Sequence, residues 1–261
     1  MLNRWQIDIS YMEINQVHCG DAELLLAELE AESIDLTLTS PPYFNARDYS
    51  TWPTLEDYME KMRVIFTQVF RTLKPSRMCV VNISPVLVPR ESRSKQSYRI
   101  PLPYYYVPMM EAIGFEFLED IIWKKPDGAA PNRNGGFFRH RKPVAYKPNI
   151  VTEYILVFKK PAPKLIDAYI RNESLVPDGY ERTNVWEFNP ETSLSDKHTA
   201  PFPEALAERV IRYYSYENDL VLDPFMGSGT TGRVARLLNR SWLGMELHQE
   251  YTDFANQRIN T

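Results

Sequence analysis

The chain has 261 residues, of which 44% are hydrophobic, and it carries a formal net charge of -4 with two cysteines. This length and apolar content predict a soluble globular protein, built as one domain with an insertion or as one large and one small domain. The composition excludes a disulfide scaffold, a transmembrane span and a protein that coats nucleic acid over its whole surface, but it is compatible with a local basic face.

The start of the chain lacks the apolar core of a signal peptide, and residues 1–10 contain Arg4 and Asp8. We therefore expect a cytoplasmic protein. The cysteines, Cys19 and Cys79, have no spacing that would suit zinc, and we expect no metal.

The N-terminal part predicts one β-loop-α-β unit. Residues 16–19 form a short strand that Gly20-Asp21 stops, and a helix follows over 22–30. Residues 34–38 alternate apolar and polar side chains with β-branched character, which indicates a second strand. In open α/β sheets, ligands bind at the carboxyl edge, where this second strand ends.

The next residues are Thr39-Ser40-Pro41-Pro42-Tyr43. The prolines lack a backbone N–H and favour extended geometry before them, so this main chain offers carbonyl acceptors and few donors. The Ser40 hydroxyl and the Pro41 carbonyl can accept the two N–H bonds of an exocyclic amine, and Tyr43 offers a face on which an extruded base can stack. A proline-terminated strand with a packed tyrosine explains the pentapeptide alone equally well.

Two regular elements and one irregular segment follow. Apolar residues at helical spacing predict a helix over 57–73 that Lys74-Pro75 ends, and residues 78–83 predict a strand buried in a parallel sheet. Four prolines within 85–103 predict a mobile loop near the carboxyl edge. This loop carries a basic patch of Arg90, Arg93, Lys95 and Arg99 against the single acid Glu91.

A second basic segment interrupts the middle of the chain. A helix is predicted over 104–113 and strands over 115–123 and 152–158, while residues 126–149 show no periodicity and mix basic with aromatic side chains. A solvated loop is one explanation, but this composition favours contacts to phosphates and bases. The candidate DNA-binding residues are Lys124, Lys125, Arg133, Arg139, Arg141, Lys142, Lys147, Arg93 and Arg99. Residues 160–190 are predicted to be irregular.

The C-terminal part contains a buried strand, a glycine-rich turn and a helix start. A helix over 204–214 follows Pro203, a strand is predicted over 220–223, and another over 242–245 before Glu246. The turn contains Gly227, Gly229 and Gly232, which satisfy the pattern G-x-G-x-x-G.

That glycine pattern is typical of dinucleotide-binding domains, and Glu246 stands at the distance of a ribose-binding acid. However, only residues 233–261 follow the last glycine, which leaves no room for the rest of such a domain. Thr230-Thr231 also replaces the lysine and hydroxyl pair of a phosphate-binding loop. The loop can instead approach a nucleoside without phosphates, such as S-adenosylmethionine, while Glu246 accepts hydrogen bonds from two ribose hydroxyls.

The two motifs together resemble those of the amino-directed DNA methyltransferases, in the group whose catalytic motif precedes the cofactor motif. The second motif reads Asp223-Pro224-Phe225-Met226-Gly227-Ser228-Gly229-Thr230-Thr231. The resemblance runs from Gly20-Asp21 to the C-terminus and includes the strand over 153–159 and the segment over 200–203. Family members often have a proline where this chain has Thr199.

The resemblance implies a circularly permuted, Rossmann-like methyltransferase fold over residues 1–261, with a seven-stranded mixed sheet, one antiparallel strand and helices on both faces. It places an inserted target-recognition region at 124–150, extended by 85–103 and 160–190. It implies that Ser40, Pro41, Pro42 and Tyr43 hold the target amine. It also implies that S-adenosylmethionine is bound by Asp21 near the adenine, by Glu246 at the ribose, and around the methionine end by Phe202, Asp223, Phe225, Gly227, Gly229 and Thr230.

The expected reaction is direct, in-line transfer of a methyl group to an amine of a flipped base, without a covalent enzyme intermediate. Methylation of cytosine C5 needs a cysteine nucleophile that typically follows proline, whereas Cys19 follows His18 and Cys79 follows Met78. In the resembling family, serine at the first tetrad position mostly accompanies N4-cytosine and aspartate mostly N6-adenine. We therefore predict N4-cytosine, with N6-adenine as the alternative.

Two other functional classes remain as remote alternatives, an NAD-dependent oxidoreductase and a catalytically silent DNA-binding relative. The expected partners are double-stranded DNA and a cognate restriction endonuclease. The protein is expected to be a monomer or a homodimer that acts on the nucleoid in a prokaryotic cytoplasm.

Overall fold

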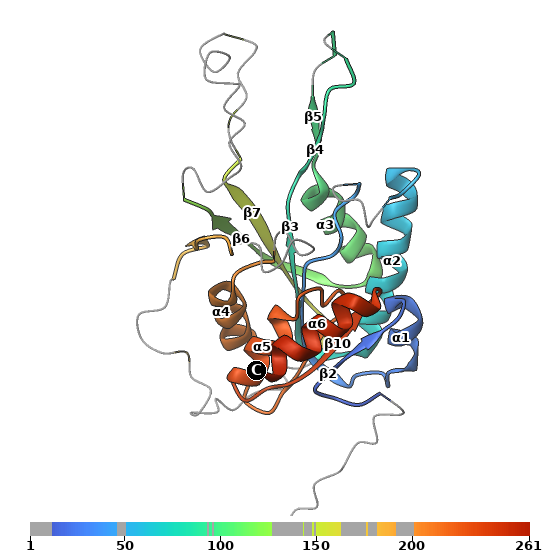
Figure 1. The fold of residues 1–261 in the computed structure, drawn as a ribbon, viewed down its shortest axis with the longest axis vertical. Helices are drawn as coiled ribbons and strands as arrows, with labels where there is room; N and C mark the ends of the chain where they lie inside the picture. Colours follow the sequence, from blue (N-terminus) through green and yellow to red (C-terminus); the bar gives the residue numbers. More distant parts are fainter. Residues whose placement is uncertain are drawn as a thin grey trace, which may run out of the picture.

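In the computed structural model, the described residues are 12–45, 51–92, 94–95, 97–126, 143, 148, 150–162, 176, 182–191 and 201–261. Within them, an eight-stranded sheet has the strand order β1-β10-β9-β2-β3-β7-β6-β8 (Figure 1). The strands are β1 Gln16–Cys19, β2 Ile34–Thr39, β3 Leu73–Ile83, β6 Glu116–Lys124, β7 Thr152–Lys159, β8 Val185–Glu187, β9 Leu220–Asp223 and β10 Ser241–Glu246. β7 pairs antiparallel with β3 and β6, and the other neighbours are parallel, so the predicted mixed sheet with one antiparallel strand is confirmed.

Helices cover both faces of the sheet, as predicted. One face packs against α1 Ala22–Glu28, α2 Leu55–Thr72 and α3 Leu102–Ile113. The other packs against α4 Glu204–Tyr214, α5 Thr230–Leu237 and α6 Gln249–Asn260. No helix among the described residues is both long and apolar enough to cross a membrane.

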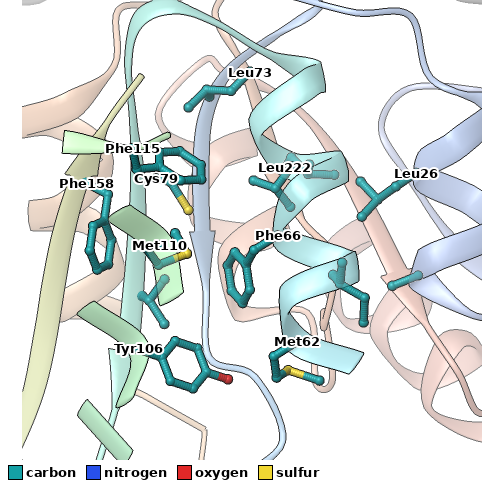
Figure 2. Close-up of a cluster of buried hydrophobic side chains, with 14 of the residues drawn as sticks. Leu26, Met62, Phe66, Leu73, Cys79, Tyr106, Met110, Phe115, Phe158 and Leu222 are labelled. Carbon is teal, nitrogen blue, oxygen red and sulfur yellow. The ribbon is translucent and has the colours of Figure 1, made fainter. Parts of the chain in front are cut away.

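The sheet separates two apolar cores. Figure 2 shows the first core, where Phe66 of α2 and Tyr106 of α3 face strand residues such as Phe158. Successive residues of a strand point to opposite faces, so Leu222 of β9 joins the first core whereas Val221 joins the second. Burial of each large apolar side chain contributes about 1.5–3 kcal/mol, and this two-sided burial explains why the central strands have long apolar runs.

Two segments that were predicted to be irregular contain strands. The expected sheet had seven strands, and the eighth, β8, lies within 160–190 and pairs parallel with β6 at the sheet edge. β8 has only three residues and its Val185 is exposed, so it gives no periodic pattern. The segment 85–103 contains a β-hairpin of β4 Val86–Val88 and β5 Tyr98–Ile100, which projects beyond the carboxyl end of β3 (Figure 1).

The start of β3 also differs from its prediction, because β3 begins at Leu73 and contains Pro75. Its register against β2 shifts between Ile34 and Leu36, which leaves extra β3 residues at the amino edge of the sheet. Lys74 and Arg77 lie in this irregular part, and their cationic groups turn toward the start of β2.

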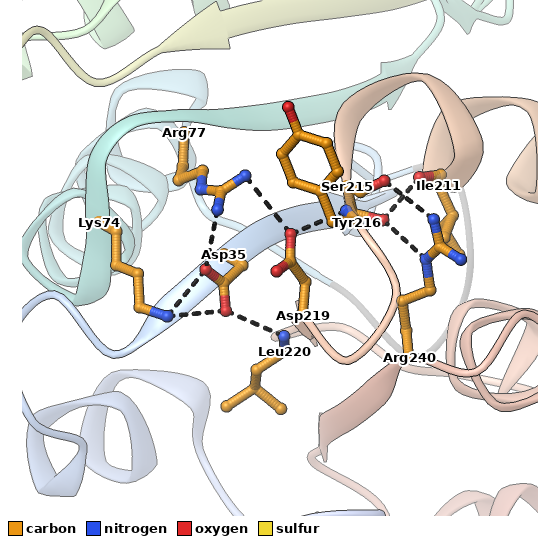
Figure 3. Close-up of polar contacts among 9 residues, drawn as sticks. All are labelled: Asp35, Lys74, Arg77, Ile211, Ser215, Tyr216, Asp219, Leu220 and Arg240. Atoms are coloured by element: carbon orange, nitrogen blue, oxygen red, sulfur yellow. Dashed lines mark hydrogen bonds and ion pairs between the residues drawn. The ribbon is translucent and has the colours of Figure 1, made fainter. Parts of the chain in front are cut away.

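These two cations surround the buried carboxylate of Asp35 (Figure 3). Lys74 Nζ lies 2.8 Å from Asp35 Oδ1, Arg77 lies 3.5 Å from the same oxygen, and the backbone N–H of Leu220 donates to Oδ2 at 3.0 Å. Arg77 also pairs with Asp219 at 3.4 Å, just before β9. Asp35 thereby ties β2, β3 and β9 together at the amino edge.

We expect Asp35→Ala to lower the free energy of unfolding by about 3 kcal/mol, the lower end for removing one partner of a buried ion pair. The Leu220 N–H loses its acceptor, whereas Lys74 can turn into solvent. Urea unfolding followed by circular dichroism measures the loss. Glu60→Gln, which removes an exposed pair with Arg63, is the control and should leave the unfolding midpoint unchanged. Equal midpoints for the two variants would contradict the role of Asp35.

Candidate active site at the carboxyl edge of the sheet

The two motifs of the sequence meet at one edge of the sheet. β2 and β9 are neighbouring parallel strands, so Ser40 and Pro224, which follow them, emerge at the same edge. β1 pairs with β10 so that Cys19 lies opposite Glu246. Because β7 is antiparallel, Glu153 near its start lies at this edge as well.

The Asp223 carboxylate links the two motifs directly. The Thr39 hydroxyl donates to Oδ1 at 2.6 Å, the Thr231 hydroxyl to Oδ2 at 2.7 Å, and the Phe225 N–H to Oδ1 at 3.0 Å. Burial raises the pKa of Asp223 to about 6, although these three hydrogen bonds oppose the shift. Both carboxylate oxygens are used inside the protein, so Asp223 positions the loops around it.

The glycines of the turn are required for different structural reasons. Gly227 and Gly229 have φ angles of 53° and 85°, in the left-handed region that favours glycine. A Cβ on Gly229 would lie 3.0 Å from Ile259, and one on Gly232 would lie 2.9 Å from both Ile259 and Trp242. Gly229 and Gly232 therefore let α5 pack closely against α6 and β10, whereas the Gly227 N–H points to Glu246.

The Glu246 carboxylate is held by backbone donors. The Gly227 N–H donates to Oε2 at 3.1 Å and the His248 N–H to Oε1 at 3.0 Å. Burial raises the pKa of Glu246, and these hydrogen bonds oppose the shift. A carboxylate has about four acceptor sites, so Glu246 keeps acceptor capacity for further donors such as a ribose hydroxyl.

Asp21 stands beside Glu246 at the end of β1. Its carboxylate accepts from the Glu23 N–H at 2.9 Å, which caps α1, and it pairs with Lys61 of α2 at 2.9 Å. The neighbouring Gly20 N–H donates to the Glu246 carbonyl at 2.8 Å. Lys61 also pairs with Glu23 at 2.7 Å, so its charge is already balanced within the protein.

The carboxylates of Asp21, Asp223 and Glu246 give this half of the edge an acidic character. Such a surface repels the phosphates of a dinucleotide and attracts a nucleoside that carries positive charge. A sulfonium nucleoside with an amino-acid ammonium group matches this chemistry. The residues present therefore fit S-adenosylmethionine better than NAD.

The other half of the edge contains Tyr43. Its hydroxyl donates to Glu153 Oε2 at 3.1 Å, and the ring packs against the first core. Asn82 Nδ2 donates to the same oxygen at 3.0 Å, and Lys125 Nζ lies 2.5 Å from Glu153 Oε1. Burial raises the pKa of Tyr43 well above its usual value, the Glu153 charge adds to this, and a hydrogen bond with the Ser40 side chain opposes it.

The remaining predicted cofactor and target residues lie around this edge. Phe202 is buried in the second core, just before α4, and Phe225 packs partly buried against the first core. Thr230 begins α5 and its hydroxyl accepts from Arg258 at 3.1 Å. Pro41 is buried, whereas Ser40 and Pro42 are half-buried.

The described part of the chain includes three of the predicted DNA-binding residues. Lys124 pairs with Glu187 of β8 at 2.6 Å and is partly exposed, and Arg99 lies half-buried in β5. Lys125 pairs with Glu153 beside Tyr43 and so joins the Tyr43 site. Outside the described residues lie Arg93, Arg133, Arg139, Arg141, Lys142 and Lys147.

Sequence analysis did not identify Glu153, Asn82 or Lys61 as site residues. Each contacts a motif residue that is distant in sequence, since Tyr43 and Glu153 are 110 positions apart. The one local indication was a lone acid at the start of an otherwise apolar strand, at Glu153.

A family model described as DNA methylase matches residues 34–257. The Type II beta methyltransferase M.BslI of Bacillus sp. (strain NEB-606) is 34% identical over 251 residues, a match that covers 92% of this chain and 27% of M.BslI. This chain thus spans about a quarter of that relative. M.SmaI, a Type II methyltransferase of Serratia marcescens, is 30% identical, with 92% of this chain and 89% of M.SmaI covered.

Solved structures show the same architecture. TTHA0409 of Thermus thermophilus, crystallised with S-adenosyl-L-methionine, superposes with a TM-score of 0.76 at 30% identity and covers 94% of this chain and 92% of its own. The cytosine-N4-specific PvuII DNA methyltransferase has a TM-score of 0.68 at 22% identity, covers 94% of this chain and 89% of its own, and shows a shared fold. The predicted methyltransferase fold is confirmed, with eight strands in place of seven.

The buried Asp223 predicts a specific pH dependence of stability. Its pKa is about 6 in the folded protein and about 3.9 in an unfolded chain, so the folded state binds this proton more tightly. Its contribution to stability is therefore complete below pH 4 and is lost as the pH rises through 6. Since Asp223→Asn cannot titrate, the free energy of unfolding of the wild type minus that of the variant should rise by about 2 kcal/mol from pH 7 to pH 4. Urea titrations measure this difference, and a constant value would contradict the prediction.

Proposed function

Because this chain belongs to the family of N6/N4 amino-directed DNA methylases, we propose that it transfers a methyl group from S-adenosylmethionine to the N4 amine of cytosine in DNA. The observation that supports this proposal is the direct link between the Ser40 loop and the glycine turn, made by Thr39, Asp223 and Thr231 at one sheet edge. The N6 amine of adenine is the alternative acceptor.

We assign the acidic half of the edge to the methyl donor, which supplies an electrophilic methyl group when bound. Glu246 accepts the ribose hydroxyls with its remaining acceptor capacity, and Asp21 lies near the adenine. Phe202, Phe225, Gly227, Gly229 and Thr230 surround the methionine end, with Asp223 behind them. The structure of TTHA0409 with S-adenosyl-L-methionine supports this assignment through its shared architecture.

The other half of the edge receives the target base. Ser40 Oγ and the Pro41 carbonyl accept the two N–H bonds of the amine, and Pro42 adds no competing donor. The Tyr43 ring stacks on the flipped base, and its hydroxyl bond to Glu153 fixes the ring orientation. Holding the amine in line with the methyl group supplies most of the rate acceleration.

Serine at the first tetrad position supports cytosine as the substrate, because Ser40 is a neutral acceptor whereas an aspartate would carry a charge. The sequence resemblance associates that neutral acceptor with N4-cytosine. PvuII methyltransferase, which is named as cytosine-N4-specific, shares the fold but too little sequence to extend its substrate to this chain.

DNA contacts are proposed for two regions at the same edge. Lys124 and Arg99 lie in β6 and β5, and the other assigned cations are Lys125, Arg93, Arg133, Arg139, Arg141, Lys142 and Lys147. We propose that residues 124–150 select the target sequence within a single catalytic domain, extended by 85–103 and 160–190. Double-stranded DNA is the substrate, a cognate restriction endonuclease is the proposed companion, and the protein acts in the cytoplasm as a monomer or homodimer.

Nucleoside mass spectrometry of DNA methylated by the purified protein should detect N4-methylcytosine. Ser40→Ala should lower the single-turnover rate by about 10²-fold, the loss typical of removing a preorganised polar contact. Ser33→Ala is the control, because the Ser33 hydroxyl bonds to the Glu30 carbonyl just before β2, at the opposite edge. If only N6-methyladenine is detected, the substrate is adenine and not cytosine. If no methylated base is detected, the result favours a catalytically silent relative.

S-adenosylhomocysteine should raise the melting temperature of the protein, whereas NAD should not. Glu246→Gln should weaken S-adenosylhomocysteine binding by about 10-fold to 100-fold, because one or two hydrogen bonds to a charged acceptor are weakened. Isothermal calorimetry measures the change, with Glu208→Gln on the exposed side of α4 as control. Stabilisation by NAD alone would instead indicate an oxidoreductase.

A further inference from the structure

We propose that Glu153 accepts the proton released by the methylated amine, through a hydrogen-bonded relay from Ser40 to Tyr43 to Glu153. The proposal rests on the proposed amine methylation and adds the destination of the proton. Glu153 touches neither the base nor the methyl donor and acts through Tyr43, so it is a positioning residue.

The contacts between the three side chains have one consistent direction. The Tyr43 hydroxyl has a single proton, which it donates to Glu153 Oε2 at 3.1 Å. In the hydrogen bond between Ser40 and Tyr43, the Ser40 hydroxyl is therefore the donor. The group that would hold the target amine is therefore two hydrogen bonds away from a carboxylate.

The reaction releases one proton for each methyl group transferred. The N–C bond forms as the C–S bond of the donor breaks, which leaves the amine nitrogen with a positive charge and one proton too many. This proton passes to Ser40 Oγ, the Ser40 proton passes to the Tyr43 oxygen, and the Tyr43 proton passes to Glu153 Oε2. Ser40 and Tyr43 each gain and lose one proton, so the net change is a neutral product and a protonated Glu153.

Tyr43 is suited to pass a proton without becoming an ion. Burial and the nearby Glu153 charge keep its pKa well above the usual value, so the phenol retains a proton before and after the transfer. Behind it, the hydroxyls of Tyr58 and Tyr106 are hydrogen-bonded to each other at 2.7 Å. The Glu153 carboxylate is the basic group that the Tyr43 hydroxyl contacts, so it is the acceptor that ends the relay.

The surroundings of Glu153 hold its carboxylate toward Tyr43. From β3, Asn82 Nδ2 donates to Oε2 at 3.0 Å, and from the end of β6, Lys125 Nζ contacts Oε1. Lys125 also lies 4.5 Å from the centre of the Trp123 ring, which fixes its position. The side chains of Glu153 and Lys125 are 15% and 20% exposed, so the proton can leave to solvent after transfer.

The decisive variants change the chemistry of Glu153 while keeping its shape. Glu153→Gln retains an oxygen that can accept from Tyr43 but cannot take up the proton, so the single-turnover rate should fall by about 10²-fold, at the low end of general acid–base effects. Glu153→Asp should retain much of the rate. Binding of S-adenosylhomocysteine should stay within about twofold of wild type, since the proposal places the methyl donor away from Glu153.

Chemical rescue separates a proton acceptor from an orienting group. Glu153→Ala should be slow, and added formate should restore its rate in proportion to the formate concentration. Glu208→Gln is the control, because Glu208 forms an ion pair with Arg212 on the exposed side of α4. It should keep the wild-type rate and show no response to formate.

Three outcomes would overturn the relay. These are a wild-type rate in Glu153→Gln, a slow Glu153→Ala that formate does not restore, and a wild-type rate in Tyr43→Phe, which keeps the ring but breaks the relay. If the Glu153 variants do not fold, the rate of Tyr43→Phe alone still tests the relay. A wild-type protein that methylates no base amine would overturn the proposed function as well, and this outcome is seen before any variant is made.

Discussion

The site depends on the buried carboxylate of Asp223 and the two threonine hydroxyls that donate to it. Thr39 ends the strand before the Ser40 loop and lies 184 positions from Asp223 in sequence. Thr231 lies in the first turn of the helix that follows the glycine turn. One side chain therefore sets the distance between the half of the edge assigned to the methyl donor and the half assigned to the base. In-line transfer requires that distance to be accurate, and the burial of Asp223 makes its hydrogen bonds costly to break.

The two edges of the sheet have different polar chemistry. At the amino edge, Asp35 and Asp219 are paired with cations, so these charges stabilise the strand ends and leave little for a ligand (Figure 3). At the carboxyl edge, Glu246 is held by backbone N–H groups and keeps acceptor capacity. Rigid pairing at one edge and available acceptors at the other fit a scaffold that binds on one side only.

The features that can be predicted from the sequence are those formed by consecutive residues. The alternation of residues 34–38, the tetrad from Ser40 and the glycine turn each occupy consecutive positions, so their pattern is visible without a structure. Glu153 and Lys61 act through contacts between distant segments, which no local pattern encodes. β8 was missed because three residues at a sheet edge show neither burial nor period, and the β4–β5 hairpin because its prolines and charges hid two short strands.

The antiparallel direction of β7 has a consequence for how such a protein can diversify. Lys124 at the end of β6 pairs with Thr152 at the start of β7, so residues 125–151 leave the sheet and return to it at adjacent positions. Closing a longer loop between fixed, neighbouring ends costs only about 0.6 kcal/mol for each doubling of its length. This segment can therefore be lengthened, shortened or exchanged at small cost to the sheet, while the chemistry at its base stays the same.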